Sequence, residues 1–354
     1  MKMSDASGKV QTVLGLINPD ELGKTLAHEH LSLVFDVAYC RPKAEDEKKA
    51  EALFSLESVG WIRQNPYSHK VNLKFNDAET VGAVVEEMTN FKSKGGGTIV
   101  ECTTHGIQRK AKFVKDVSLQ SGVHVIAGTG FYVAGSQLTD VLSRPIEILV
   151  KLMTAEILSG CIDADDVKCG LIGEIGCSWP LHDFEKKVIE ATALVQSELG
   201  CPVSFHPGRN PESPFEIIRI FQEAGGDVSK VAMSHLDRTI FDEGQLTEFA
   251  ELGCYCEFDL FGIECSYYQL NEAIDMPSDA QRIQSIWQLV DGNFEDRILL
   301  SHDIHTKHRL TKFGGHGYTH IFDNVVPKMS NRGLSSSIVK KFLVDNPKAW
   351  LTFK

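Results

Sequence analysis

Short apolar runs alternate with longer amphipathic segments along most of the chain. The apolar runs end at glycines or polar turns, as buried strands do, and the segments between them have helical spacing. The segment 76–93, for example, opens with a capping-box spacing and stops at three consecutive glycines. Strands are therefore expected at 25–30, 98–103, 123–128, 170–176, 201–206, 231–235, 254–258 and 297–303, and helices at 76–93, 109–121, 138–158, 184–199, 214–223, 243–251, 279–290, 321–329 and 335–344.

This repeat predicts an α/β fold, a (β/α)8 TIM barrel. Short apolar strands that alternate with helices form a parallel sheet, and eight units of roughly 30 residues have the length of such a barrel. A doubly wound open sheet is the alternative, but its glycine-rich phosphate loop is missing, because 128–130 is too short to form one. No linker divides the chain, so residues 1–354 are expected to form one domain, with a polar insertion at about 36–75.

Composition narrows the classes of partner. A net charge of -12 argues against nucleic acid and anionic membranes, whereas an anionic small molecule can still bind in a locally basic pocket. The nine cysteines are odd in number and scattered, which favours a reducing compartment over a disulfide framework. The N-terminal residues lack an apolar signal core, so the cytosol is the expected location. A homodimer is compatible with the sequence.

Six potential metal ligands fall at the predicted strand ends, where parallel barrels carry their active sites. His28 and His30 are two residues apart, so they share one face of their strand while Glu29 points away. The other four belong to four different strands: Glu174, His206, His235 and Asp303. Imidazoles and carboxylates bind zinc and related divalent ions, and six such groups suit two ions that share a carboxylate. The pattern predicts a binuclear metal centre at the C-terminal ends of the strands.

Each residue also has a structural interpretation. A single strand-end histidine, such as His206 or His235, is more often a hydrogen-bonded core residue than a ligand, and Asp303 could cap the following helix. A chance gathering of all six at the strand ends of one barrel is much less expected than a metal site.

Six longer stretches resemble the phosphotriesterase family of the amidohydrolase superfamily, and the resemblance covers essentially the whole chain. The stretches are 25–30, 173–180, 206–209, 233–239, 302–307 and 314–318. The resemblance implies one metal ion surrounded by His28, His30, Glu174 and Asp303, and a second held by Glu174, His206 and His235. This chain departs from phosphotriesterases at the bridging position, where they use a lysine carboxylated on its amine. Glu174 can bridge two cations without that modification, which puts organophosphate hydrolysis in doubt.

The resemblance further implies hydrolysis of small N-acylated amines, such as N-acetyltaurine and N-acetyl amino acids, to acetate and the free amine. Two divalent ions, expected to be zinc, would supply a bridging hydroxide. Asp303 is the candidate catalytic residue that takes the proton and passes it to the leaving nitrogen. Hydrolysis of lactones, esters or organophosphates at the same site is the alternative, and a catalytically silent metal-binding protein is the third hypothesis.

Four residues are candidates for contact with the substrate. Arg209, three residues after His206, could hold a sulfonate or carboxylate through forked hydrogen bonds, although a surface salt bridge would explain it equally well. The other candidates are Tyr132, Tyr268 of the pair Tyr267-Tyr268, and His316 between two glycines. Arg238 and Lys307 also lie just beyond strand ends, with weaker cases.

Overall fold

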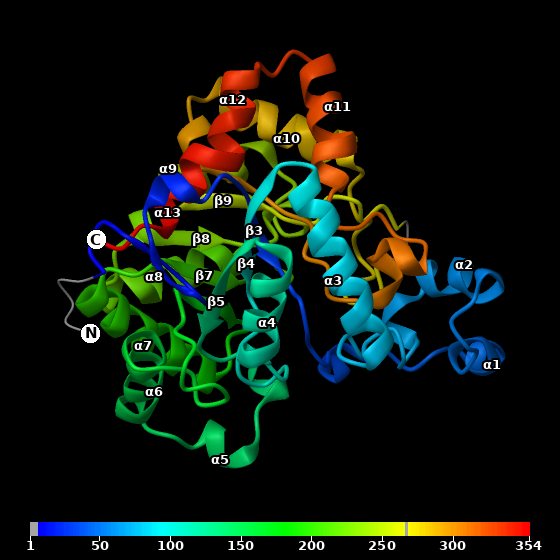
Figure 1. Ribbon diagram of the computed structural model, residues 1–354, viewed down its shortest axis with the longest axis horizontal. Coiled ribbons are helices and arrows are strands. Elements are labelled where there is room, and N and C mark those ends of the chain that lie inside the picture. The colour runs from blue at the N-terminus through cyan, green and yellow to red at the C-terminus, as the bar shows by residue number, and fades with distance from the viewer. Residues whose placement is uncertain (1–5, 266–267) are drawn as a thin grey trace.

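The computed structural model describes residues 6–265 and 268–354, and its central feature is an eight-stranded sheet (Figure 1). The strands are β3 (Lys24–Glu29), β4 (Gly96–Glu101), β5 (His124–Thr129), β6 (Leu171–Gly176), β7 (Val203–His206), β8 (Val231–Met233), β9 (Tyr255–Phe258) and β10 (Ile298–Leu300). Each strand pairs in parallel with the next one along the chain. The predicted (β/α)8 TIM barrel is therefore confirmed.

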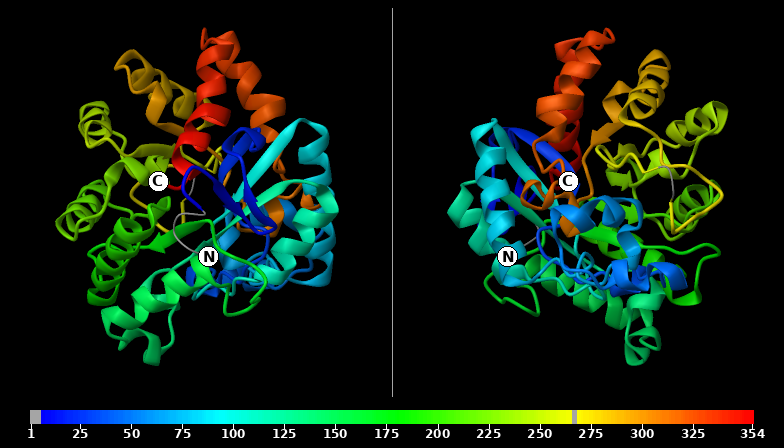
Figure 2. Two further views of the ribbon diagram at one scale, coloured as in Figure 1. Left: turned by 60° about the vertical axis from the view of Figure 1, so that its left-hand side comes forward. Right: turned by 90° about the vertical axis from the view of Figure 1, so that its right-hand side faces the viewer.

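Helices surround the strands on the outside of the barrel (Figure 2). They are α3 (Ala78–Ser93), α4 (Ala111–Ser121), α5 (Thr139–Leu142), α6 (Ile146–Leu158), α7 (Asp183–Leu199), α8 (Ser213–Glu223), α9 (Glu243–Glu251), α10 (Asp279–Asp291), α11 (Val326–Asn331), α12 (Ser336–Lys340) and α13 (Asn346–Leu351). The single helix expected at 138–158 is divided into α5 and α6. Pro145 explains the break, because proline lacks an N–H and disfavours helical geometry in the residue before it.

Two segments outside the repeat cover opposite ends of the barrel. The hairpin of β1 (Val10–Thr12) and β2 (Gly15–Ile17) packs Val10 into one apolar cluster with Leu171 and Tyr255, the first residues of β6 and β9. This hairpin therefore closes the amino ends of the strands. The segment 36–75, which contains α1 (Glu47–Ala50) and α2 (Leu56–Gln64), instead places Tyr67 in the cavity at the carboxyl ends. No helix in the described residues has the length and apolarity needed to cross a membrane.

The first and last strands meet at a seam that the Glu29 side chain joins. The Glu29 carboxylate accepts hydrogen bonds from Ser301 Oγ and from the backbone N–H groups of His302 and Ile304, each at 2.9 Å. The backbone N–H of Asp303 donates to His28 O at 3.2 Å across the same seam. These bonds anchor both neighbours of Asp303, which fixes its place beside β3.

A buried ion pair holds the loop before α4 against α6. Arg109 Nη2 lies 2.5 Å from Glu156 Oε1, and both side chains are 2% exposed. Removing one partner of such a pair leaves an uncompensated buried charge. We expect Arg109→Met to lower the free energy of unfolding by about 3–5 kcal/mol, as measured by urea denaturation.

The same pair predicts an acid-sensitive contribution to stability. Burial raises the pKa of Glu156, but hydrogen bonds from Arg109 and His105 outweigh burial and hold this pKa well below 4.5. The unfolded chain therefore takes up the proton first, so the stabilisation is present above pH 4.5 and is lost as the pH falls below it. The difference in the free energy of unfolding between wild type and Arg109→Met should therefore become smaller as the pH falls below 4.5. Arg219→Met, which removes an exposed arginine of α8, serves as the control and should leave stability unchanged.

Candidate metal centre and its cavity

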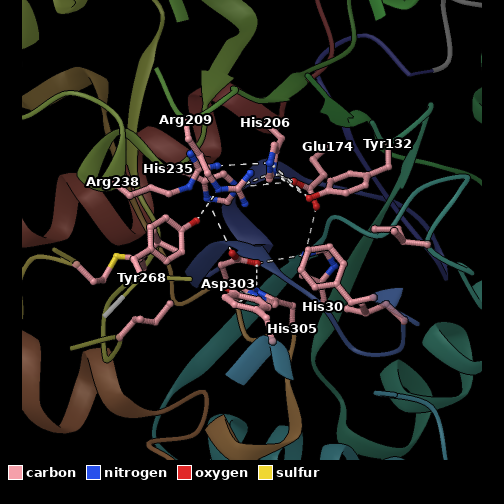
Figure 3. A pocket seen from close by; sticks show the side chains of 17 residues that line it. His30, Tyr132, Glu174, His206, Arg209, His235, Arg238, Tyr268, Asp303 and His305 are labelled. Atoms are coloured by element: carbon pink, nitrogen blue, oxygen red, sulfur yellow. Dashed lines mark hydrogen bonds and ion pairs between the residues drawn. The ribbon is translucent and has the colours of Figure 1, made fainter. Parts of the chain in front are cut away.

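The six side chains predicted to bind metal meet in one place at the carboxyl ends of the strands. Figure 3 shows five of them: His30, Glu174, His206, His235 and Asp303. His28 lies on β3, Glu174 on β6, and His206 is the last residue of β7. The other three follow strands directly or within a few residues: His30, His235 and Asp303. None of the six residues is more than 6% exposed. The barrel thus brings together groups that are separated by up to 275 positions in the sequence.

Glu174 lies between two groups of ligand atoms. Its Oε1 is 3.3 Å from His30 Nε2, and His30 Nε2 is in turn 3.2 Å from Asp303 Oδ1. Its Oε2 is 2.8 Å from His206 Nδ1 and 3.7 Å from His235 Nε2. One carboxylate therefore faces both groups, as a bridging ligand must.

The residues present fit divalent cations. Within each group, His28 with His30 and Asp303, and Glu174 with His206 and His235, the ligand atoms lie within 4.8 Å of one another. His28 Nε2 is buried and lacks a hydrogen-bond partner in the described part of the chain. It lies 3.7 Å from Glu174 and 3.8 Å from Asp303, distances too long for hydrogen bonds. A buried, unpaired ring nitrogen between two carboxylates is costly in free energy, and a cation would satisfy it.

Buried polar groups hold the outer nitrogens of the histidines. Thr103 Oγ1 lies 2.8 Å from His30 Nδ1, Ser234 Oγ lies 3.0 Å from His28 Nδ1, and Asp259 Oδ1 lies 2.8 Å from His235 Nδ1. Such contacts fix ring orientation and leave the opposite nitrogen free to ligate. Sequence reasoning missed these three residues, although polar residues next to apolar strands were a visible signal.

Within the described residues, two further clusters have ligand-like spacing, but protein groups already use their carboxylates. Asp259 lies near His28 and His235, but it accepts hydrogen bonds from the His235 backbone N–H. The cluster of Glu156, Cys161 and Asp163 pairs with the Arg109 guanidinium, which takes the place of a cation.

Unusual backbone geometry places three of the site residues. His235 and Asp303 have φ values of 57° and 51°, a region that costs a non-glycine residue about 1–3 kcal/mol. Gly173, before Glu174, has φ 138°, and a Cβ there would come within 2.4 Å of Ser204 O. Only glycine therefore lets β6 approach β7 closely enough at this point.

The electrostatics of the site favour a cation. Burial raises the pKa of Glu174 and of Asp303, but neighbouring histidines outweigh burial and hold both pKa values well below the ordinary range. Burial disfavours charged His30, yet hydrogen bonds to Asp303 and Glu174 raise its pKa to about 9. Burial lowers the pKa of His206 to about 4, against the pull of Glu174. Both carboxylates are thus ionised, the state that binds metal, whereas His30 has to release its proton before its ring nitrogen can ligate.

The cavity beside the six candidate ligands is lined by most of the predicted substrate residues. Tyr132, Arg209 and Tyr268 line it, and Arg209 Nε donates to the Tyr268 hydroxyl at 2.8 Å. Tyr132 OH lies 3.4 Å from His206 Nε2. His316 lies instead in an adjoining outer cavity that shares Tyr268 with the central one.

Three other residues near strand ends have distinct positions. Arg238 lines the central cavity, whereas Lys307 forms an ion pair with Asp77. Tyr267 lies outside the described residues. His305, which sequence reasoning missed, lies 3.1 Å from Asp303 Oδ1, and its Nε2 is 3.1 Å from the Tyr67 hydroxyl. Its position two residues after Asp303 was the available signal.

Comparison with known proteins places the chain in a family. The model of the Phosphotriesterase family matches residues 8–351. N-acetyltaurine hydrolase of Mus musculus is 55% identical and that of Homo sapiens 53% identical, each over 99% of this chain and 100% of the relative. The crystal structure of a Resiniferatoxin-binding protein from Rhodobacter sphaeroides superimposes with a TM-score of 0.92 at 31% identity, over 97% of this chain and 95% of that one. The chain belongs to the phosphotriesterase family.

Proposed function

We propose that this protein hydrolyses the amide bond of N-acetyltaurine and related N-acetyl amino acids to acetate and the free amine. The observation that carries the proposal is the meeting of two ligand groups at the single carboxylate of Glu174. The substrate is proposed because relatives with 53% and 55% identity over nearly the full chain are named N-acetyltaurine hydrolase. The scattered free cysteines support a cytosolic location.

Two divalent ions, proposed to be zinc, would be held by this chain's own residues. His28, His30 and Asp303 would bind one, His206 and His235 the other, and Glu174 both. When bound, such ions supply Lewis acidity, which polarises a carbonyl oxygen and makes water a stronger acid. The side chains then have to orient the amide, exclude bulk water and move one proton.

Asp303 is proposed to move that proton. It takes a proton from the attacking water and delivers it to the leaving nitrogen, acting first as a base and then as an acid. His305 restrains this carboxylate, since its Nδ1 lies 3.1 Å from Asp303 Oδ1 and 2.8 Å from Asp303 O. The Tyr67 hydroxyl can donate to His305 Nε2, which leaves the ring proton on Nδ1, facing Asp303.

The cavity walls are proposed to orient the substrate. Arg209, positioned by Tyr268, faces the anionic end of the molecule, while Tyr132 packs beside His206 along the acyl end. His316 lies further out, and there it can meet a ligand only as it enters. This arrangement calls for a short substrate with one anionic end.

A substrate panel tests the proposal. We expect metal-loaded protein to cleave N-acetyltaurine with a higher kcat/KM than a γ-lactone or a paraoxon-like triester. Chelation should abolish this hydrolysis, and zinc should restore it, with product taurine quantified by mass spectrometry. Turnover of lactones or triesters alone would refute the amide assignment. No turnover of any panel member by protein of verified metal content would favour a catalytically silent metal-binding protein.

A further inference from the structure

Arg238 is a buried cation that forms no ion pair in the described residues, because the buried carboxylate of its neighbour Asp237 pairs with Arg282 instead. It is 3% exposed and lines the central cavity. Its guanidinium donates to Pro207 O and to Thr239 Oγ1, each at 3.2 Å, and the described residues provide it with no carboxylate within ion-pair distance. Two other buried arginines, Arg109 and Arg282, do pair with carboxylates. Burying an uncompensated charge is costly, so an anion from outside the chain is the natural partner of Arg238.

Arg209 presents a second guanidinium to the same cavity. Its Nε donates to the Tyr268 hydroxyl, and its guanidinium carbon lies 5.7 Å from the centre of the Tyr268 ring. In the described residues its two terminal nitrogens make no ion pair with a carboxylate. Arg209 follows β7 and Arg238 follows β8, the neighbouring strand. Figure 3 shows both side chains entering the cavity on the side of His206 and His235, across from His30 and His305.

The distance between Arg238 and the proposed metal-binding residues sets the length of the substrate that can reach both. Arg238 Nη2 lies 3.4 Å from His206 Nε2, whereas His206 Nδ1 faces Glu174. The imidazole ring of His206 therefore lies between the Arg238 guanidinium and the atoms proposed to bind metal. The amide nitrogen and sulfonate of N-acetyltaurine are separated by two methylene groups, which matches this short span.

We propose that Arg238 and Arg209 form a two-arginine clamp that binds the sulfonate and makes the site prefer a sulfonate to a carboxylate. This inference rests on the proposed function and deepens it. A sulfonate carries three oxygens in a tetrahedral arrangement, so it can accept N–H groups from two guanidiniums that approach from different directions. A carboxylate has two coplanar oxygens, which a single guanidinium fork already satisfies.

Kinetics of matched substrates test the clamp. The substrates are N-acetyltaurine, its carboxylate analogue N-acetyl-β-alanine, and the neutral N-ethylacetamide. Arg238→Met should lower kcat/KM for N-acetyltaurine by about 10- to 150-fold, the loss expected for a charge-assisted hydrogen bond. It should lower kcat/KM less for N-acetyl-β-alanine and least for N-ethylacetamide, which has no anion for the clamp to bind. Equal losses on all three substrates, or no loss on N-acetyltaurine, would overturn the clamp.

Further variants separate recognition from folding. Arg238→Lys keeps the positive charge but loses the paired N–H donors of the guanidinium. Its preference for N-acetyltaurine over N-acetyl-β-alanine should therefore lie between those of wild type and Arg238→Met. Arg209→Met should reduce the sulfonate preference in the same direction as Arg238→Met. Arg219→Met, on the exposed face of α8, removes the same charge and should change no kinetic parameter.

Binding measurements distinguish failure of the clamp from failure of the proposed function. Calorimetric titration of metal-loaded protein with ethanesulfonate, which has no amide to cleave, should show binding that both Arg238→Met and Arg209→Met weaken. If wild type binds ethanesulfonate in this way but cleaves no amide, the clamp stands and the hydrolase proposal fails. If wild type cleaves N-acetyltaurine and both variants bind ethanesulfonate as tightly as it does, the clamp alone fails.

Discussion

Asp303→Asn is expected to lower kcat for N-acetyltaurine by about 10²- to 10⁴-fold, the usual contribution of a general acid–base group. Asparagine has nearly the same size, but its amide oxygen cannot take up a proton at neutral pH. Asp303 is 6% exposed and lies between His30 and His305. Among the described residues, Glu174 is the one other carboxylate that lines the cavity, and it is proposed to bind the ions instead. The rate should be measured at saturating substrate and expressed per bound metal ion.

Normalising to metal content separates the two roles proposed for Asp303. If the residue only held an ion, the rate per bound ion would stay at the wild-type level, and the proton-transfer role would be wrong. Asp140→Asn makes the same chemical change at an exposed carboxylate of α5 that pairs with Arg144, and it should leave kcat unchanged.

Glu174→Gln is expected to weaken metal binding by more than about 100-fold, beyond the 10- to 100-fold typical of residues that only support a ligand. A neutral amide cannot compensate the charge of two cations, and His30, His206 and His235 would each lose the carboxylate that they face. Metal content after dialysis against a weak chelator is the direct measurement, and hydrolysis should fall in parallel. Glu216→Gln, at a partly exposed position of α8, is the matched control.

The chemistry of Glu174 also predicts how the site is loaded. A glutamate needs no modification by carbon dioxide, so uptake of zinc should be as complete in carbon dioxide-free buffer as with bicarbonate. A requirement for bicarbonate would contradict a simple glutamate bridge. Retention of two ions per chain by Glu174→Gln would contradict any bridge at this position.

The strands and the gathering of the six candidate ligands were predictable because their signals are local. Each strand is an apolar run of a few residues, and each ligand candidate lies near the end of such a run or within three residues after it, so barrel topology alone brings them together. Pro145, which divides α5 from α6, was also visible in the sequence but was not given enough weight against the apolar periodicity of the segment.

The surroundings of the ligands depend on contacts between distant segments, which periodicity does not report. Ser234 reaches His28 across 206 positions, and Thr103 reaches His30 across 73. Lys307 and Arg238 both follow strands closely in the sequence. In the folded chain, Lys307 pairs with the carboxylate of Asp77, whereas Arg238 lines the cavity. Whether a charge is compensated is a property of the packed structure.

The seam joined by Glu29 determines when the site can form during synthesis. His28 emerges early from the ribosome, whereas Ser301, His302 and Asp303 emerge only after most of the chain has been translated. A nascent chain that has not yet released β10 has neither the seam nor Asp303, so it can assemble only part of the pocket for the first cation. Acquisition of the two proposed ions would therefore be a late event, and we expect shortened translation products that end before residue 301 not to retain the pair.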